Sequence, residues 1–225
     1  MRAFVVASSP QSLKPASASP HPGDLVIAAD GGANLCRAWG WTPTCVVGDM
    51  DSLRPATVEW LHAHSVPLQR HPVEKDQTDL ELALSAALTA GVDEIIIAGA
   101  LGARIDHTLG NLALLALPTL AGVQTCIADG GQTIWLVRSR LTIHGQPGDT
   151  LSLIPFGGDA AGVEAVGVHW PLHDARLALG PSLGISNRLE DDRAEVAVRQ
   201  GSLLVVHTRS EAVVQEHGKR ERSER

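Results

Sequence analysis

Residues Glu94–Asn111, EIIIAGALGARIDHTLGN, contain the pattern on which the fold of the first half of this chain depends. The run Glu94–Ala98 is short and almost wholly apolar, which is typical of a buried strand. Glycines then interrupt the pattern, and His107–Leu117 has the composition of a helix. A strand that leads through a glycine turn directly into a helix is the repeating unit of an α/β fold with a parallel sheet.

The same order of elements recurs along residues 1–130. Apolar runs predict strands at Ala3–Ala7, Leu25–Ala28, Cys45–Val47, Pro67–Arg70, Glu94–Ala98 and Thr125–Ala128. Helical patterns lie between them, at Gly31–Trp39, Ala56–His64, Asp79–Thr89 and His107–Leu117. We therefore predict an N-terminal α/β domain, residues 1–130, with a mostly parallel sheet.

The pattern changes after Gly130. Short β-branched or alternating runs follow at intervals of roughly ten residues, separated by Gly, Pro and Asp, as in a β-sandwich or barrel. These runs are Thr133–Val137, Leu141–His144, Thr150–Pro155, Gly162–Val168, Ala175–Leu179, Glu195–Arg199 and Ser202–Thr208. We predict an all-β C-terminal sandwich domain over residues 131–208 and a polar, disordered tail over residues 209–225.

Composition excludes several classes of protein. The 225 residues carry 25 acidic and 18 basic side chains, and the net charge of −7 argues against a general nucleic-acid binder. Aromatic residues make up 3% of the chain, too few for a base-stacking surface. No apolar run approaches the roughly 18 residues that cross a bilayer, and the N-terminus lacks a signal-peptide core. The three cysteines fit no zinc pattern and are expected to be reduced, as in a cytoplasmic protein. Taken with the charge and the apolar runs, the composition predicts a cytoplasmic protein that binds neither membrane nor nucleic acid.

The acidic charge is concentrated in the first half. Residues 1–130 hold 13 acidic against 7 basic side chains, and nine of the acids are aspartate, which favours caps, turns and metal sites. Six of these nine lie in four short loops between a strand and a helix: Asp30, Asp49, Asp51, Asp76, Asp79 and Asp106. Because the carboxyl ends of parallel strands meet at one edge of a sheet, we expect the four loops to converge.

The first two loops combine glycine with aspartate. In Ala29–Asn34, ADGGAN, the glycines let the backbone approach a phosphate and Asp30 ends a strand, although Asp30 as a plain helix cap is the alternative. In Val46–Ser52, VVGDMDS, Asp49 and Asp51 are two residues apart and can face the same way. A divalent cation would relieve their repulsion; a surface turn is the alternative.

The third loop, Glu74–Glu81, EKDQTDLE, precedes a helix. Thr78 and Glu81 make a capping-box pattern, which places Asp79 in the first helical turn. Lys75 is one of three lysines in the chain and is suited to contact a phosphate beside a metal. A plain capping box with solvated neighbours is the alternative.

The fourth loop opens Gly99–Asn111. Arg104 offers a two-pronged donor to phosphate, and Asp106 can bind a metal or cap the helix. His107 and Asn111 lie about one turn apart, so they can share a helix face. A packing role for His107 is equally compatible with the sequence.

Several carboxylates, one lysine, one arginine and several helix starts at one sheet edge describe a magnesium–nucleotide site. The chain has no Walker-type motif, no kinase glycine-rich loop and no G-x-S-x-G. Any nucleotide chemistry must therefore use a different set of loops.

The ordered set ADGGAN, GDMDS, EKDQTDLELAL and GALGARIDHTLGN resembles the thiamine pyrophosphokinase family, over roughly residues 3–208. In the second half, Leu151–Pro155, Gly167–Leu172 and Gly184–Asn187 resemble segments of that family's β-domain. The resemblance implies transfer of the pyrophosphoryl group of ATP to the hydroxyl of thiamine, with Mg²⁺ and release of AMP. It also implies a homodimer with the substrate site at the subunit interface.

The resemblance further implies roles for individual residues. The catalytic and metal-binding acids would be Asp49, Asp51, Asp76, Asp79 and Asp106, with Arg104 as a catalytic phosphate clamp. The residues that bind the co-substrate would be Asp30, Gly31, Lys75, Gln77, Thr78, Arg104, His107 and Asn111. Trp170 would cover thiamine, and Ser186 and Asn187 would line its pocket.

The sequence departs from the family pattern at two places. Arg188 occupies a position where the family commonly has an acid, and Ser8-Ser9-Pro10 lacks the glycine expected after the first strand.

Three other functions fit parts of the pattern. A related pyrophosphokinase acting on a pterin alcohol would share the acids, but Trp170 and Ser186–Asn187 favour thiamine. A non-catalytic nucleotide-binding regulator on the same fold would be expected to lose some of the acids, all of which are present. A metal-dependent phosphohydrolase would need a water-activating base or a paired-metal signature that the sequence does not contain.

Overall fold

The structure is a computed structural model, which describes residues 1–102 and 104–210. The chain divides into two compact units, Met1–Gly130 and Gly131–Arg225, and the first unit ends at the residue where the sequence pattern changes. Within the described ranges, no helix is long and apolar enough to cross a membrane. The tail predicted for residues 209–225 lies, from residue 211 onward, outside the described residues.

The first unit is built on six strands that pair in parallel, in the order β6-β5-β1-β2-β3-β4. Their bounds are β1 Arg2–Val6, β2 Leu25–Ala29, β3 Cys45–Gly48, β4 Leu68–Arg70, β5 Glu94–Ala98 and β6 Gln124–Asp129. The central strands are apolar on both sides because helices cover both faces of the sheet, and Phe4, Val5 and Ile97 are completely buried.

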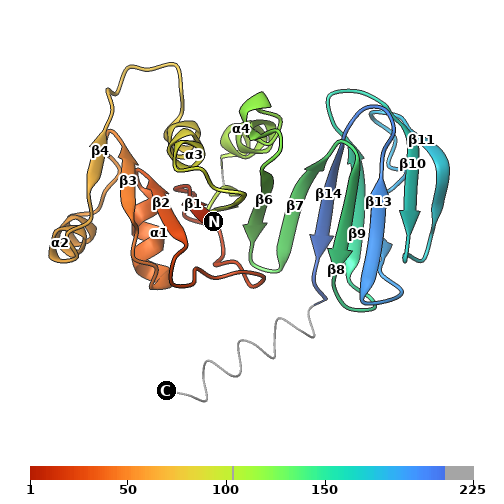
Figure 1. Cartoon of the computed structure of the whole chain (residues 1–225), viewed down its shortest axis with the longest axis horizontal. Helices are drawn as coiled ribbons and strands as arrows, with labels where there is room; N and C mark the ends of the chain where they lie inside the picture. The colour runs from red at the N-terminus through yellow and green to blue at the C-terminus, as the bar shows by residue number, and fades with distance from the viewer. Residues whose placement is uncertain (103, 211–225) are drawn as a thin grey trace, which may run out of the picture. The chain divides into compact units, whose positions relative to one another are not determined.

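Four α-helices and a 3₁₀ helix connect these strands: α1 Gly32–Trp39, α2 Pro55–Ala63, α3 Asp79–Thr89, α4 Ile105–Leu114 and η1 Pro118–Leu120. Helices α1 and α2 lie on one face of the sheet and α3 and α4 on the other (Figure 1), as expected for right-handed crossovers. Helix α4 begins two residues before the predicted His107, because Arg104 is its N-cap residue and has an extended backbone.

The strand order reverses beside β1, which lies between β2 and β5. In open α/β sheets, the loops that leave such a point in opposite directions border a crevice at the carboxyl edge. The loops after β1 and β5 approach closely there. Gly99 has a φ of +71°, and a Cβ on it would lie 2.4 Å from the carbonyl oxygen of Ala7. The crevice is therefore expected between these two loops.

Gly32, the first residue of α1, packs directly on strand β1, since an added Cβ would lie 2.0 Å from the carbonyl oxygen of Val6. We expect Gly32→Ala to lower the free energy of unfolding by about 3 kcal/mol, because the backbone of β1 has to move. Gly110→Ala in α4 is the control: its Cβ would meet nothing within 4 Å, and it is expected to add up to about 1 kcal/mol of stability. Urea unfolding measures both. Wild-type stability in Gly32→Ala would contradict the close packing.

The second unit contains two antiparallel sets of strands, in the orders β12-β9-β14-β7 and β11-β10-β13-β8. Their bounds are β7 Gln132–Val137, β8 Arg140–His144, β9 Thr150–Pro155, β10 Ala160–Val166, β11 Leu172–Leu177, β12 Asn187–Arg188, β13 Arg193–Ala197 and β14 Leu203–Thr208. Leu153 and Val205 from one set share an apolar core with Val163 and Val196 from the other. This is the sandwich that the sequence predicts; β12 was missed because a strand of two residues has no periodicity.

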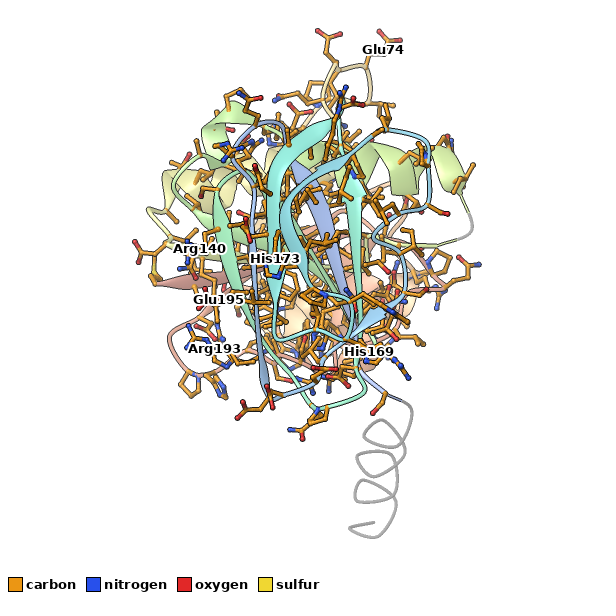
Figure 2. The ribbon with its side chains drawn as sticks, turned by 90° about the vertical axis from the view of Figure 1, so that its right-hand side faces the viewer. Glu74, Arg140, His169, His173, Arg193 and Glu195 are labelled. Carbon is orange, nitrogen blue, oxygen red and sulfur yellow. The ribbon has the colours of Figure 1, made fainter. Side chains whose placement is uncertain are left out.

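Charged groups in the second unit occupy two different environments. On the exposed side of β8 and β13, Glu195 accepts hydrogen bonds from Arg140 at 3.1 Å and from Arg193 (Figure 2). Asp149 and His207, by contrast, are buried, with Oδ2 and Nε2 2.8 Å apart. Burial acts to raise the pKa of Asp149, but hydrogen bonds from two backbone N–H groups and His207 lower it. This pair joins β14 to the turn that precedes β9.

Candidate active site

Three aspartates from three of the predicted loops meet in the first unit. Asp30 follows β2, Asp49 follows β3 and Asp79 opens α3, and one carboxylate oxygen of each lies within 4.8 Å of the others. Lys75 joins this acidic cluster, with its Nζ 3.1 Å from Asp79 Oδ1 and 3.5 Å from Asp49 Oδ2. The convergence follows from topology, because β2 and β3 are neighbouring parallel strands that end at the same edge.

Asp30 is the most deeply buried acid of the cluster, at 5% exposed. Burial raises its pKa, and the charges of Asp49 and Asp79 act in the same direction, while the Ser52 hydroxyl and a backbone N–H oppose them. Its Oδ1 has no hydrogen-bond partner among the described residues. The N-cap of α1 is Gly31, so Asp30 is not the plain helix cap considered from the sequence. A buried, unpartnered oxygen beside two more carboxylates is a ligand set that fits a divalent cation.

Gly48 leaves the space that lets the three acids approach. It has a φ of +148°, and a Cβ there would lie 2.8 Å from Asp30 Cβ and 3.0 Å from Asp79 Oδ1. A hydrogen bond from the Asp51 N–H to Asp49 Oδ1, helped by the charge of Lys75, lowers the pKa of Asp49. Burial acts to lower the pKa of Lys75, but the two carboxylates outweigh it and raise that pKa. The cluster thus holds ionised groups of both signs.

Three other predicted metal ligands are not brought to the acidic cluster. Met50 has a φ of +72° and turns the chain between Asp49 and Asp51, whose carboxylate instead accepts a hydrogen bond from the Ser52 hydroxyl at 2.8 Å. Asp76 is exposed, and Asp106 pairs with an arginine. Asp30, which the sequence assigns to co-substrate binding, lies among the metal-binding candidates instead.

A cleft of about 830 Å³ opens beside the acidic cluster, within the usual size range of small-molecule sites. Predicted site residues line it from the third and fourth loops and from the loop after β3: Asp49, Lys75, Gln77, Thr78, Asp79, Arg104, Asp106, His107 and Asn111. Asp30, Gly31, Asp51 and Asp76 are not among its lining residues. Ser8–Gln11 also line the cleft, although this segment lacks the glycine expected after the first strand and its sequence predicts no role for it. Its position directly after a buried strand was the signal that could have found it.

Arg104 and Asp106 form a two-pronged ion pair at the cleft. Arg104 Nη2 lies 2.6 Å from Asp106 Oδ2 and Nε lies 3.3 Å from Oδ1, which raises the pKa of Arg104 and lowers that of Asp106. The two side chains are 70% and 61% exposed. Exposed pairs of this kind are weak, so the guanidinium can exchange its carboxylate partner for a phosphate.

The remaining predicted residues lie in the second unit. Trp170 is 55% exposed, and the guanidinium of Arg188 lies 5.5 Å from the centroid of its ring. Asn187 is buried: its Oδ1 accepts the Trp170 N–H at 3.0 Å, and its Nδ2 donates to the Trp170 carbonyl at 2.8 Å. Asn187 therefore holds the backbone that carries Trp170. Ser186 has a φ of +60° and donates its N–H to Ser152 Oγ at 3.0 Å.

An acidic cluster with a paired lysine, at the carboxyl edge of a parallel sheet and beside a cleft of this size, is typical of enzymes that transfer phosphoryl groups. Two family models match the chain. The model described as "Thiamin pyrophosphokinase, catalytic domain" covers residues 21–127, and "Thiamin pyrophosphokinase, vitamin B1 binding domain" covers residues 139–203. The chain belongs to the thiamine pyrophosphokinase family.

Individual relatives agree with this assignment. The thiamine pyrophosphokinase of Bacillus subtilis (strain 168) is 29% identical over 215 residues, which cover 91% of this chain and 97% of the relative. Thiamine pyrophosphokinase 1 of Oryza sativa subsp. japonica is 27% identical, over 76% of this chain and 74% of the relative. The crystal structure of the Bacillus subtilis protein superposes with a TM-score of 0.84 at 28% identity, covering 93% of this chain and all of that one.

Proposed function

We propose that this protein transfers the pyrophosphoryl group of ATP to the hydroxyl of thiamine, giving thiamine diphosphate and AMP. The observation that carries the proposal is the acidic cluster with Lys75 beside the cleft, inside the segment that matches the catalytic family model. Residues 1–130 would bind ATP and Mg²⁺. Residues 131–208 would bind thiamine and form a homodimer with the substrate site at the subunit interface, as the resemblance implies.

The acidic cluster supports Mg²⁺ as the cation. Asp30, Asp49 and Asp79 supply the oxygen ligands that Mg²⁺ prefers, and the unpartnered Asp30 oxygen would gain a partner. When bound, the ion would neutralise charge on the triphosphate during transfer. We assign these three residues as its direct protein ligands.

The cationic side chains of the cleft support phosphate binding. In an in-line displacement, the thiamine hydroxyl oxygen bonds to the β-phosphorus and releases its proton, while the bond from that phosphorus to the α,β-bridging oxygen breaks and AMP leaves with this oxygen. Catalysis therefore depends on positioning and on charge stabilisation. Lys75 is held ionised by Asp49 and Asp79 and can donate to a phosphate oxygen. Arg104 can clamp two phosphate oxygens with its planar fork.

The reaction is tested with ATP, Mg²⁺ and thiamine, followed by chromatographic separation of the products. We expect thiamine diphosphate and AMP in equal amounts, and no product when EDTA removes the metal. ADP in place of AMP, or no thiamine diphosphate, would contradict the proposal. A pterin alcohol offered in place of thiamine tests the alternative substrate, and we expect no transfer to it.

Trp170 is the residue expected to bind thiamine, because its exposed ring already attracts a cation, the Arg188 guanidinium. We expect Trp170→Ala to raise the KM for thiamine about tenfold, with the KM for ATP unchanged. Trp170→Phe keeps an aromatic face and should retain most of the affinity. Steady-state kinetics with each substrate varied in turn measures this. An unchanged thiamine KM in Trp170→Ala would exclude the ring from the thiamine site.

A further inference from the structure

The turn Ala100–Gly102, between β5 and α4, has its backbone groups bonded by three side chains. Asn111 Nδ2 donates to the Ala100 carbonyl at 2.7 Å. The Ser12 hydroxyl donates to the Leu101 carbonyl and accepts the Leu101 N–H at 3.2 Å. The Thr108 hydroxyl donates to the Gly102 carbonyl at 3.3 Å and accepts the Gly102 N–H at 3.1 Å. Each hydroxyl therefore bonds both backbone groups of one residue in the turn.

The three side chains reach the turn from two sides. Ser12 belongs to the loop after β1 and is only 7% exposed, whereas Thr108 and Asn111 belong to α4. The β1 loop also contacts the turn elsewhere. The Ser9 N–H donates to the Gly99 carbonyl at 2.9 Å, and a Cβ on Gly102 would lie 1.8 Å from Ser9 Oγ. The turn is thus enclosed between the β1 loop and α4.

These polar bonds matter because α4 has no buried residue. Apolar packing, which normally holds a helix on a sheet, depends here on half-buried side chains such as Leu112 and Leu114. Arg104 is the N-cap of α4, and its carbonyl accepts the Thr108 N–H at 3.0 Å. Thr108 therefore bonds both to the turn, through its side chain, and to Arg104, through its backbone.

We propose that Ser12, Thr108 and Asn111 are positioning residues that fix the Ala100–Gly102 turn and the start of α4, so that Arg104 faces the nucleotide phosphates in the cleft. The inference rests on the proposed function, since it takes Arg104 as the group that binds phosphate. It assigns Asn111 to positioning in place of the direct ligand contact expected from the sequence. Ser12 and Thr108, which no sequence motif marks as site residues, take a positioning role.

A role in stability alone would lower the amount of folded enzyme and leave the KM for ATP unchanged. Thr108→Val keeps the shape of the side chain and removes the hydroxyl. We expect it to raise the KM for ATP about tenfold and to leave the KM for thiamine unchanged. Thr108→Ser restores the hydroxyl and should bring the KM to within about twofold of the wild type. Thr89→Val is the matched control, since that hydroxyl bonds the Ser85 carbonyl at 2.8 Å, and Thr89 is not among the lining residues of the cleft.

A double-mutant cycle with Arg104→Ala separates positioning from direct contact. If Thr108 acts through Arg104, adding Thr108→Val to Arg104→Ala should raise the KM for ATP by less than about a further twofold. The proposal would be overturned if Thr108→Val raised the KM for ATP tenfold both in the wild type and in Arg104→Ala. A Thr108→Val enzyme with the wild-type KM for ATP would also overturn it. Ser12→Ala, with the exposed Ser19→Ala as its control, should behave like Thr108→Val.

The same variants are also measured by calorimetric titration with ATP, which needs no turnover. A wild-type protein that binds ATP but forms no thiamine diphosphate would contradict the proposed function alone, and the binding cycle would still decide the positioning role. Equal ATP affinity in the wild type and Thr108→Val would contradict the positioning role alone.

Discussion

Replacing Asp79 with asparagine is expected to lower kcat/KM for thiamine diphosphate synthesis roughly a thousandfold while the protein stays folded. Asparagine has nearly the same shape, so the close approach to Gly48 is kept. The change removes one of the three charges of the acidic cluster and one of the two carboxylates that hold Lys75. Steady-state kinetics measures the loss, and titration with Mg²⁺ should show weaker binding of the ion.

Two further variants make this result specific. Asp174→Asn is the control, because Asp174 pairs with Arg199 on an exposed surface and has a φ of +47° that asparagine accepts. Asp51→Asn is the contrast: the sequence places Asp51 in the metal site, whereas the structure bonds it to Ser52 outside the acidic cluster. We expect a much smaller loss from Asp51→Asn than from Asp79→Asn. The reverse order of effects would show that the cluster is not the metal site.

Arg104→Ala is expected to lower kcat/KM for ATP by about two to three orders of magnitude. The variant loses the planar fork that neutralises phosphate charge in the transition state. It also leaves Asp106, whose pKa Arg104 holds low, as an unpaired negative charge at the cleft. Arg104→Lys keeps the charge without the fork and should fall between alanine and the wild type. Kinetics with ATP varied at saturating thiamine measures all three enzymes.

Arg140→Ala is a matched control for this experiment. The side chain of Arg140 is 70% exposed, as is that of Arg104, and it also pairs with one carboxylate, Glu195 (Figure 2). Arg140 lies on β8, and the cleft has no lining residue from that strand. We expect wild-type kinetics. An equal loss of kcat/KM for ATP in Arg104→Ala and Arg140→Ala would indicate a general effect of charge and not a phosphate clamp.

Local patterns were sufficient to predict most elements of the first unit. Strand β5 and helix α3 have the predicted bounds, because an apolar run and a capping signal mark their ends. The cap is confirmed: Thr78 Oγ1 accepts the Glu81 N–H at 3.2 Å. The start of α4 was predicted two residues late, since Arg104 caps that helix without a side-chain hydrogen bond and leaves no signal in the sequence.

The site was predicted less completely than the fold. Convergence of the loops could be inferred, but the choice of acids depends on backbone angles at single residues, as at Gly48 and Met50. The partners of Asn111 and Asn187 are backbone groups of other segments, 11 and 17 residues away. No spacing rule identifies such partners, so the sequence does not predict that these two side chains bond the backbone of other segments.

Residue order alone establishes that the acids of these loops lie at one edge of the sheet, because parallel strands all end in the same direction. It does not establish which strands are neighbours. Strand order follows from packing between segments far apart in the chain, and it places β5 beside β1 and β3 beside β2. That order brings Asp30 to Asp49, and it sets the Ser8–Gln11 loop opposite the turn before Arg104. The kind of chemistry at the site can therefore be predicted from local sequence, whereas the set of residues that meet there depends on long-range contacts.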